Sequence, residues 1–171
     1  MQRYVISNLQ LGRPSAIKKY DRPFKNVDEM DEHLIQTWNS VVSEGDLVYH
    51  LGNFAWDPKT AQTAISRLNG TIWFVTGEDD AAIVELAQKD MLSDGASVKM
   101  QIFPLKQMET TVSYWPLQDW PGKKDGYWSI IGNPSREYKS DPKERRINAS
   151  ADLWNFKPQK LDHIIGIFSD L

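Results

Sequence analysis

The sequence contains no cysteine and only three histidines among its 171 residues. The absence of cysteine excludes disulfides, thiolate zinc sites and cysteine nucleophiles, and it suits a reducing compartment. No two of the histidines have the spacing of metal ligands, so we expect no histidine-based metal site. His50, which lies two residues before Gly52, is expected instead to hydrogen-bond to the backbone.

The sequence also lacks long apolar runs and an excess of positive charge. No stretch approaches the roughly 20 apolar residues that a transmembrane helix needs. Residues 1–7 begin like a strand and turn polar at once, so we expect no secretory signal peptide. The formal net charge is −3, whereas a general nucleic-acid binder needs a basic face. We therefore expect neither a membrane nor a nucleic acid as the partner.

No internal repeat, low-complexity tract or Gly/Ser-rich linker divides the chain. Residues 1–171 are therefore predicted to form a single domain. Hydrophobic residues make up 40% of the chain and charged residues 25%, which is typical of a globular protein. A chain of this length buries roughly 70% of its unfolded surface, so it needs no disulfide or metal for stability.

The first half of the chain alternates between predicted strands and helices. Apolar residues over 27–42 recur in steps of three and four, which predicts an amphipathic helix with Asn26 as its N-cap. Asp57 followed by Pro58 predicts a second helix start. The predicted helices cover 27–42, 58–68 and 81–89, and the predicted strands cover 3–7, 46–51 and 71–76.

The second half is predicted to be mostly β. Its shorter strands lie near 97–104, 109–115, 127–131 and 146–151, separated by loops rich in Pro, Gly and Asp. Together the two halves predict an α/β fold: a layered α/β sandwich with two mixed β-sheets flanked by helices.

Polar residues beside Gly or Pro follow each of several predicted strands. In an open α/β sheet, ligands sit outside the carboxyl ends of the parallel strands. The strand ends therefore predict one polar site lined by amides, by the carboxylates of Glu78 and Asp79, and by Arg13. The segments concerned are 7–10, 51–54, 76–80, 113–116 and 131–135.

At these strand ends the sequence resembles the calcineurin-like metallophosphoesterase family, in its small phage and bacterial branch. The likeness extends over nearly the whole chain and includes Asp46–Gly52, the turn Leu68–Gly70 and the segment Trp154–Pro158. The resemblance implies the metallophosphoesterase-like layered α/β sandwich. It also implies a family chemistry in which two divalent metals activate a water and neutralise a phosphate.

Other residues stand where the family places its metal ligands and catalytic acid. Amides replace the Asp-x-His motif and the bridging Asp, an acidic pair replaces Asn-His, and Tyr replaces a lone His. The last motif, Gly-His-x-His, keeps only its Gly. The positions of this degenerate site are Asn8, Gln10, Arg13, Asn53, Glu78, Asp79, Tyr114, Asn133 and Ser135.

These replacements argue against a two-metal site. Neutral amide oxygens bind Mg²⁺ or Mn²⁺ more weakly than carboxylates do, and no imidazole or bridging carboxylate remains. The alternative is one weakly held Mg²⁺ or Ca²⁺ on Glu78, Asp79, Asn8 and Asn53. Arg13, Glu78 and Asp79 could form a new anion-binding or catalytic set, but an internal ion pair that replaces the metals electrostatically is the favoured interpretation.

An aromatic stretch surrounds Pro116 and Pro121. We expect Trp115 and Trp128 to pack on the second sheet, and we consider Trp120 and Tyr127 as possible contacts for a protein partner. The mixed-charge segment that follows, 136–146, is expected to be a solvated loop.

The combination of a retained scaffold and lost ligands predicts a catalytically inactive pseudoenzyme with a binding or structural role and no cofactor. One expected form is a phage virion or accessory protein that docks on a larger assembly. Another is a soluble binder of a host factor or a nucleotide, in which Arg13 would contact the phosphate. The enzymatic alternative is a weak phosphodiesterase with an altered metal site. These roles place the protein in a virion or in the host cytoplasm.

Overall fold

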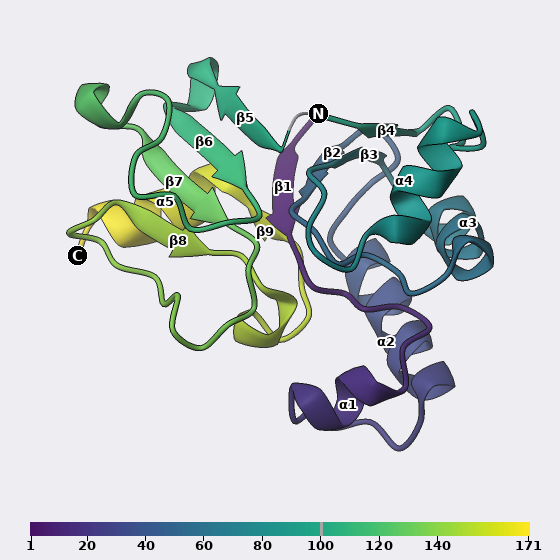
Figure 1. Ribbon diagram of the computed structural model, residues 1–171. Helices are drawn as coiled ribbons and strands as arrows, with labels where there is room; N and C mark the ends of the chain where they lie inside the picture. Colours follow the sequence, from purple (N-terminus) through teal and green to yellow (C-terminus); the bar gives the residue numbers. More distant parts are fainter. Residues whose placement is uncertain (100) are drawn as a thin grey trace.

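The computed structural model describes residues 1–99 and 101–171. It contains two mixed β-sheets with helices around them (Figure 1). This arrangement confirms the predicted layered α/β sandwich.

The first sheet has the strand order β4-β3-β2-β1-β9, with β9 antiparallel to β1 and every other pair parallel. Ile6, His50 and Phe74 lie side by side in the register of β1, β2 and β3, so the segments that follow them leave the sheet at one edge. The strands are β1 (Arg3–Ile6), β2 (Leu47–His50), β3 (Thr71–Phe74), β4 (Ala96–Val98) and β9 (Gln159–Lys160).

Helices α2, α3 and α4 bury one face of this sheet. The helices are α1 (Ser15–Lys19), α2 (Val27–Asn39), α3 (Pro58–Arg67) and α4 (Ala81–Gln88). The predicted caps are confirmed, because the backbone N–H of Glu29 donates to Asn26 Oδ1 and that of Thr60 donates to Asp57 Oδ1. Among residues 1–99 and 101–171, no helix combines the length and the apolar character needed to cross a membrane.

The second sheet has the order β5-β6-β7-β8, with β5 antiparallel and the remaining pairs parallel. Its strands are β5 (Ile102–Leu105), β6 (Thr110–Ser113), β7 (Trp128–Ile131) and β8 (Arg146–Asn148). The single strand predicted over 97–104 is wrong. β4 pairs with β3 in the first sheet and β5 pairs with β6 in the second, so the chain changes sheets within that range.

The two sheets and α5 (Leu161–Ser169) share one apolar cluster, which includes Val5 and Tyr49 from the first sheet and Val112 and Ile130 from the second. Helix α5 was not predicted, and it contributes Leu161 and Ile164 to this cluster. Short 3-10 helices complete the described elements: η1 (Lys106–Met108), η2 (Lys123–Asp125) and η3 (Ala151–Leu153).

The tryptophans around the second sheet are placed differently from the prediction. Trp128 is buried as expected, but Trp115 is 46% exposed and Trp120 only 4% exposed. Trp120 is buried because the segment after β6 folds back over that strand. There Thr111 Oγ1 donates to the carbonyl of Pro121, and Trp120 Nε1 donates to the carbonyl of Tyr127. Trp120 is thus a packing residue rather than an available partner contact, and the half-buried Tyr127 is tied to it.

The carboxyl ends of the two sheets meet at Gly132. A Cβ added to Gly132 would lie 1.8 Å from the carbonyl oxygen of Leu51, so only glycine permits this approach. Ser7 joins the contact, since its hydroxyl donates to the carbonyl of Gly132. The strand ends of both sheets therefore converge on one region.

Candidate functional site

Three of the predicted site residues adopt left-handed backbone conformations in the turns after β1 and β2. The φ angles of Asn8, Gln10 and Asn53 are 58°, 58° and 61°. Asparagine tolerates this region, whereas the longer glutamine occupies it at a conformational cost. Backbone bonds hold the turns together: Asn8 N–H donates to the carbonyl of Gly52 and Gln10 N–H to that of Asn53.

Gln10 lies at the centre of a polar network. Its Nε2 donates to Asn8 Oδ1 at 3.0 Å and to Asp79 Oδ2 at 3.2 Å, and its Oε1 accepts from Arg13 Nη1 at 2.9 Å. Arg13 Nη1 also pairs with Asp79 Oδ2 at 2.5 Å. The guanidinium of Arg13 lies 4.3 Å from the ring centre of the exposed Trp56, a cation–π contact. The expected internal ion pair is thus present, and its acidic member is Asp79.

Asn53 connects this network to Tyr114 and Glu78. Its Nδ2 donates to the Tyr114 hydroxyl at 3.2 Å and, more weakly, to Asn8 Oδ1 at 3.4 Å. Its Oδ1 accepts from the backbone N–H of Asp79 at 3.1 Å. The Tyr114 hydroxyl donates in turn to Glu78 Oε2 at 3.2 Å. Side chains from the first four predicted strand ends therefore form hydrogen bonds with one another.

The Tyr114 ring fills the space beneath the network, and it is only 1% exposed. A Cβ on Gly52 or Gly77 would lie 2.4 or 2.6 Å from its Cδ2, so both positions need glycine. Burial raises the pKa of Tyr114, and the nearby Glu78 carboxylate raises it further. The hydroxyl therefore stays protonated and remains a donor at neutral pH.

A buried ion pair that the sequence analysis did not predict holds the segment 8–10 in place. The Arg22 side chain is fully buried and reaches Asp152 through Nε to Oδ1 at 2.8 Å and Nη2 to Oδ2 at 3.0 Å. It also donates to the carbonyls of Leu9 and Asn8. Asn8 Nδ2 donates to Asp152 Oδ2 at 2.9 Å, which joins this pair to the network.

Asp80 is a second residue that the sequence analysis missed. Its carboxylate accepts the backbone N–H groups of Asn53, Phe54 and Gly77, and so ties the ends of β2 and β3 together. Burial raises the pKa of Asp80, while these amide bonds oppose the rise. The signal was its place at the end of the run Gly77–Asp80, directly before α4.

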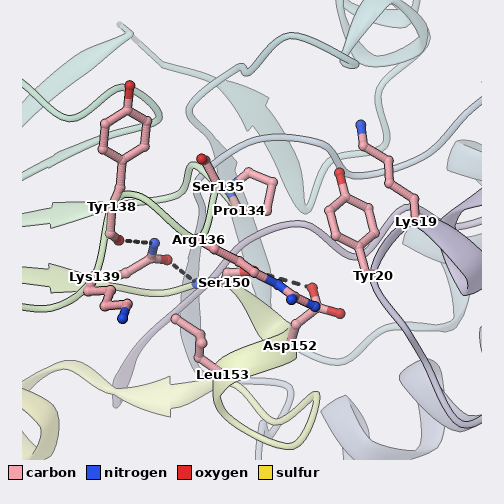
Figure 2. A pocket seen from close by; sticks show the side chains of 11 residues that line it. Lys19, Tyr20, Pro134, Ser135, Arg136, Tyr138, Lys139, Ser150, Asp152 and Leu153 are labelled. Atoms are coloured by element: carbon pink, nitrogen blue, oxygen red, sulfur yellow. Dashed lines mark hydrogen bonds between the residues drawn. The ribbon is translucent and has the colours of Figure 1, made fainter.

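Asn133 and Ser135 lie outside the network. Asn133 Oδ1 accepts from the backbone N–H of Ser135, and the Asn133 carbonyl accepts from Asn148 Nδ2. Ser135 lines a cavity of about 660 Å³ that also includes Lys19, Arg136 and Asp152 (Figure 2). Asp152 therefore belongs both to the cavity wall and to the network.

Within the described part of the chain, no three His, Asp or Glu side chains are grouped closely enough to hold a metal ion. The side chains considered for a single weak cation, Glu78, Asp79, Asn8 and Asn53, are bonded to neighbouring side chains or amides instead. The hydrogen-bonded network can therefore hold together the loops that follow the strands. It also borders the adjoining cavity.

Comparison with known proteins identifies a relative of nearly the same length. No protein-family model matches the chain. The uncharacterised protein MJ1445 of Methanocaldococcus jannaschii is 30% identical over 172 residues, which span 96% of this chain and 89% of that protein. The chain belongs to the MJ1445 family.

A solved structure shows that the fold occurs elsewhere. The crystal structure of AQ665, a protein of unknown function from Aquifex aeolicus, matches with a TM-score of 0.71. The match covers 97% of this chain and 98% of that one, at 20% sequence identity. The two chains thus share a fold over nearly their whole lengths.

His50 is buried without the backbone hydrogen bond that the sequence predicted. Its ring lies against Phe54 and Phe74, with ring centres 5.0 and 5.9 Å away. Neither ring nitrogen has a hydrogen-bond partner in the described part of the protein. In the parallel sheet, the backbone of β2 pairs with β1 and β3. The side chain of His50 points into the core on the face that the helices cover. Burial lowers the pKa of His50 to about 3.

The buried imidazole predicts a loss of stability at acidic pH. An unfolded histidine has a pKa of about 6.5, so between that value and pH 3 the unfolded chain binds a proton that the native state does not. The free energy of unfolding should fall with decreasing pH by up to about 1.4 kcal/mol per unit from this group. Urea unfolding from pH 7 to pH 4 measures the slope, which should be shallower in His50→Leu.

The exposed His163 provides the matched control, and His163→Leu should keep the slope of the parent protein. Burial raises the pKa of Asp31 to about 6, and this contributes in the opposite sense, because native-state protonation stabilises the fold below that pH. That contribution is common to all three proteins and cancels in their differences. Equal slopes for His50→Leu and the parent would contradict the prediction.

Proposed function

We propose that this protein is a metallophosphoesterase-like pseudoenzyme, in which the former catalytic pocket has become a structural element and the remaining role is binding. The observation that carries the proposal is the closed network from Arg13 through Gln10 and Asn53 to Tyr114 and Glu78. Apart from Arg13 Nε, which is buried without a hydrogen-bond partner in the described part of the protein, its side chains bond to one another. The Tyr114 ring fills the space beneath them.

The two metals that the sequence resemblance implies do not fit these residues. A two-metal site needs a bridging carboxylate and further anionic or imidazole ligands. Asn53 stands at the bridging position, and its amide nitrogen donates to Asn8 and Tyr114. Arg13 places a positive charge on Asp79, where a cation would otherwise be attracted. Arg13 therefore takes over part of the charge compensation that metals provide in the family.

The proposed partner is a protein, either a phage structural assembly or a host factor, as expected from the phage branch that the sequence resembles. Trp56 and Trp115 favour such a role, because they are 54% and 46% exposed and each contacts a network residue. Exposed tryptophans beside a rigid polar cluster suit a protein contact. They replace Trp120 and Tyr127 as the aromatic contact residues of this proposal.

A metal-binding and hydrolysis experiment tests the proposal. Protein stripped with a chelator should melt at the same temperature, within about 1 °C, with or without excess Mn²⁺ or Mg²⁺, because a cation that binds only the native state would raise the melting temperature. The same samples should not hydrolyse bis-p-nitrophenyl phosphate above the rate of Mn²⁺ alone.

Charge-removing variants control this test. If a cation-dependent shift appears and Glu78→Gln or Asp79→Asn abolishes it, whereas the exposed Glu32→Gln does not, the altered site binds metal. Metal binding there together with turnover of the ester would contradict the pseudoenzyme proposal and support the weak phosphodiesterase.

A further inference from the structure

The cavity beside the network is large enough for a small ligand. Its volume is about 660 Å³, within the 300–1,000 Å³ range typical of small-molecule sites. One wall comes from α1 and the residue after it, and the other walls come from the loop after β7 and from the segment that runs from the end of β8 through η3 (Figure 2). Ligand-sized space thus lies at the carboxyl ends of the second sheet, next to the filled pocket.

The charges around this cavity are predominantly positive. Lys19, Arg136 and Lys139 line it, and within the described part of the chain none of them belongs to an ion pair. Asp152 is the acidic residue among its lining residues. Both carboxylate oxygens of Asp152 are bonded by the buried guanidinium of Arg22, which neutralises that charge. The cavity therefore concentrates free positive charge on a protein whose net charge is −3.

We propose that this cavity binds the phosphate group of a small molecule through Lys19, Arg136 and Lys139. Figure 2 shows Arg136 extending from its loop across the cavity toward Asp152. A guanidinium offers a planar fork of donors that matches two phosphate oxygens, and the flanking ammonium groups suit a dianion better than a carboxylate. The Ser135 hydroxyl is a further donor at the same wall.

The cavity also has surface for an organic group attached to the phosphate. Tyr20 and Leu153 line it, and Leu153 is 59% exposed. Two cations already lie near the Tyr20 ring, since Lys19 Nζ and the Arg22 guanidinium are 5.2 and 5.3 Å from its centre. A nucleoside monophosphate has a planar base that can stack on such a ring and a phosphate that can pair with the lining cations. The assignment differs from the earlier expectation for Arg13, which pairs with Asp79.

This inference rests on the proposed binding role and names a ligand class for it. Calorimetric titration with a chelator present, using AMP, inorganic phosphate and adenosine, tests it. We expect AMP to saturate one site below about 1 mM at low ionic strength, and the affinity to fall with added salt because the lining cations are exposed. Saturable binding of inorganic phosphate also supports the inference, and an AMP affinity above that of phosphate shows that the organic group contributes.

Charge variants locate the site. Arg136→Ala should weaken AMP binding at least tenfold, whereas Lys124→Ala, which removes an exposed charge that does not line the cavity, should change it less than twofold. Both variants alter exposed side chains, and their melting temperatures confirm folding. Absence of saturable binding, equal affinities in the two variants, or adenosine binding as well as AMP would overturn the inference.

The result is independent of the metal test. Hydrolysis of bis-p-nitrophenyl phosphate with Mn²⁺ would contradict the pseudoenzyme proposal even if AMP binds. Absence of AMP binding without any hydrolysis would overturn only the phosphate site.

Discussion

Replacement of Arg22 by methionine should lower the free energy of unfolding by about 3–5 kcal/mol, the cost of leaving one partner of a buried ion pair uncompensated. The Arg22 side chain is fully buried, and it donates to both oxygens of Asp152 and to the carbonyls of Asn8 and Leu9. The variant therefore also leaves two backbone carbonyls without this donor. Urea unfolding followed by tryptophan fluorescence measures the loss.

The control removes an arginine from an exposed ion pair. Arg67 pairs with Glu32, and these side chains are 44% and 47% exposed. Exposed pairs contribute little, because water and salt screen them, so Arg67→Met should change stability only slightly. Arg22→Lys should be intermediate, since an ammonium keeps the charge but cannot reach all four acceptors. Similar losses for Arg22→Met and Arg67→Met would contradict the structural role assigned to Arg22.

The sequence predicted those parts of the fold that depend on local patterns. The caps at Asn26 and Asp57 were predicted, and so was the order of elements in the first half apart from the short α1, because capping residues and helical periodicity lie within a few positions of one another. The change of sheet between β4 and β5 was missed, because strand propensity does not say which partner a strand will pair with.

The candidate site was predicted in part. Asn8, Gln10, Arg13, Asn53, Glu78, Asp79 and Tyr114 do come together, since the ends of parallel strands meet at one edge. Asn133 instead accepts from the backbone N–H of Ser135, and Ser135 lines the cavity. The Arg22–Asp152 pair could not be predicted, because its members are 130 residues apart and no local pattern relates them. The exposure of Trp115 and Trp120 was reversed for a similar reason: composition does not determine which side of a loop is buried.

Tyr114→Ala should destabilise the protein by about 3–5 kcal/mol, in the range measured when a large aromatic side chain is removed from a core. The ring is 1% exposed and packs directly on Gly52 and Gly77, whose missing side chains make its space. The backbone at these two glycines is constrained and cannot easily move into the cavity that the missing ring would leave. Little of the lost stability should therefore be recovered by relaxation. Urea unfolding at neutral pH measures it.

Two variants separate the ring from its hydroxyl and from its neighbour. Tyr114→Phe keeps the ring but leaves Asn53 Nδ2 and Glu78 without the phenol, and it should cost about 1 kcal/mol. Trp115→Ala removes the adjacent ring, which is 46% exposed, and should cost well under half of the Tyr114→Ala loss. A loss below about 1 kcal/mol in Tyr114→Ala would mean that the ring does not fill the pocket, because even one removed methylene in a close-packed core is worth nearly that much. The space beneath the Arg13–Gln10–Asn53 network would then have to be open in solution, which would contradict the proposed structural role of these residues.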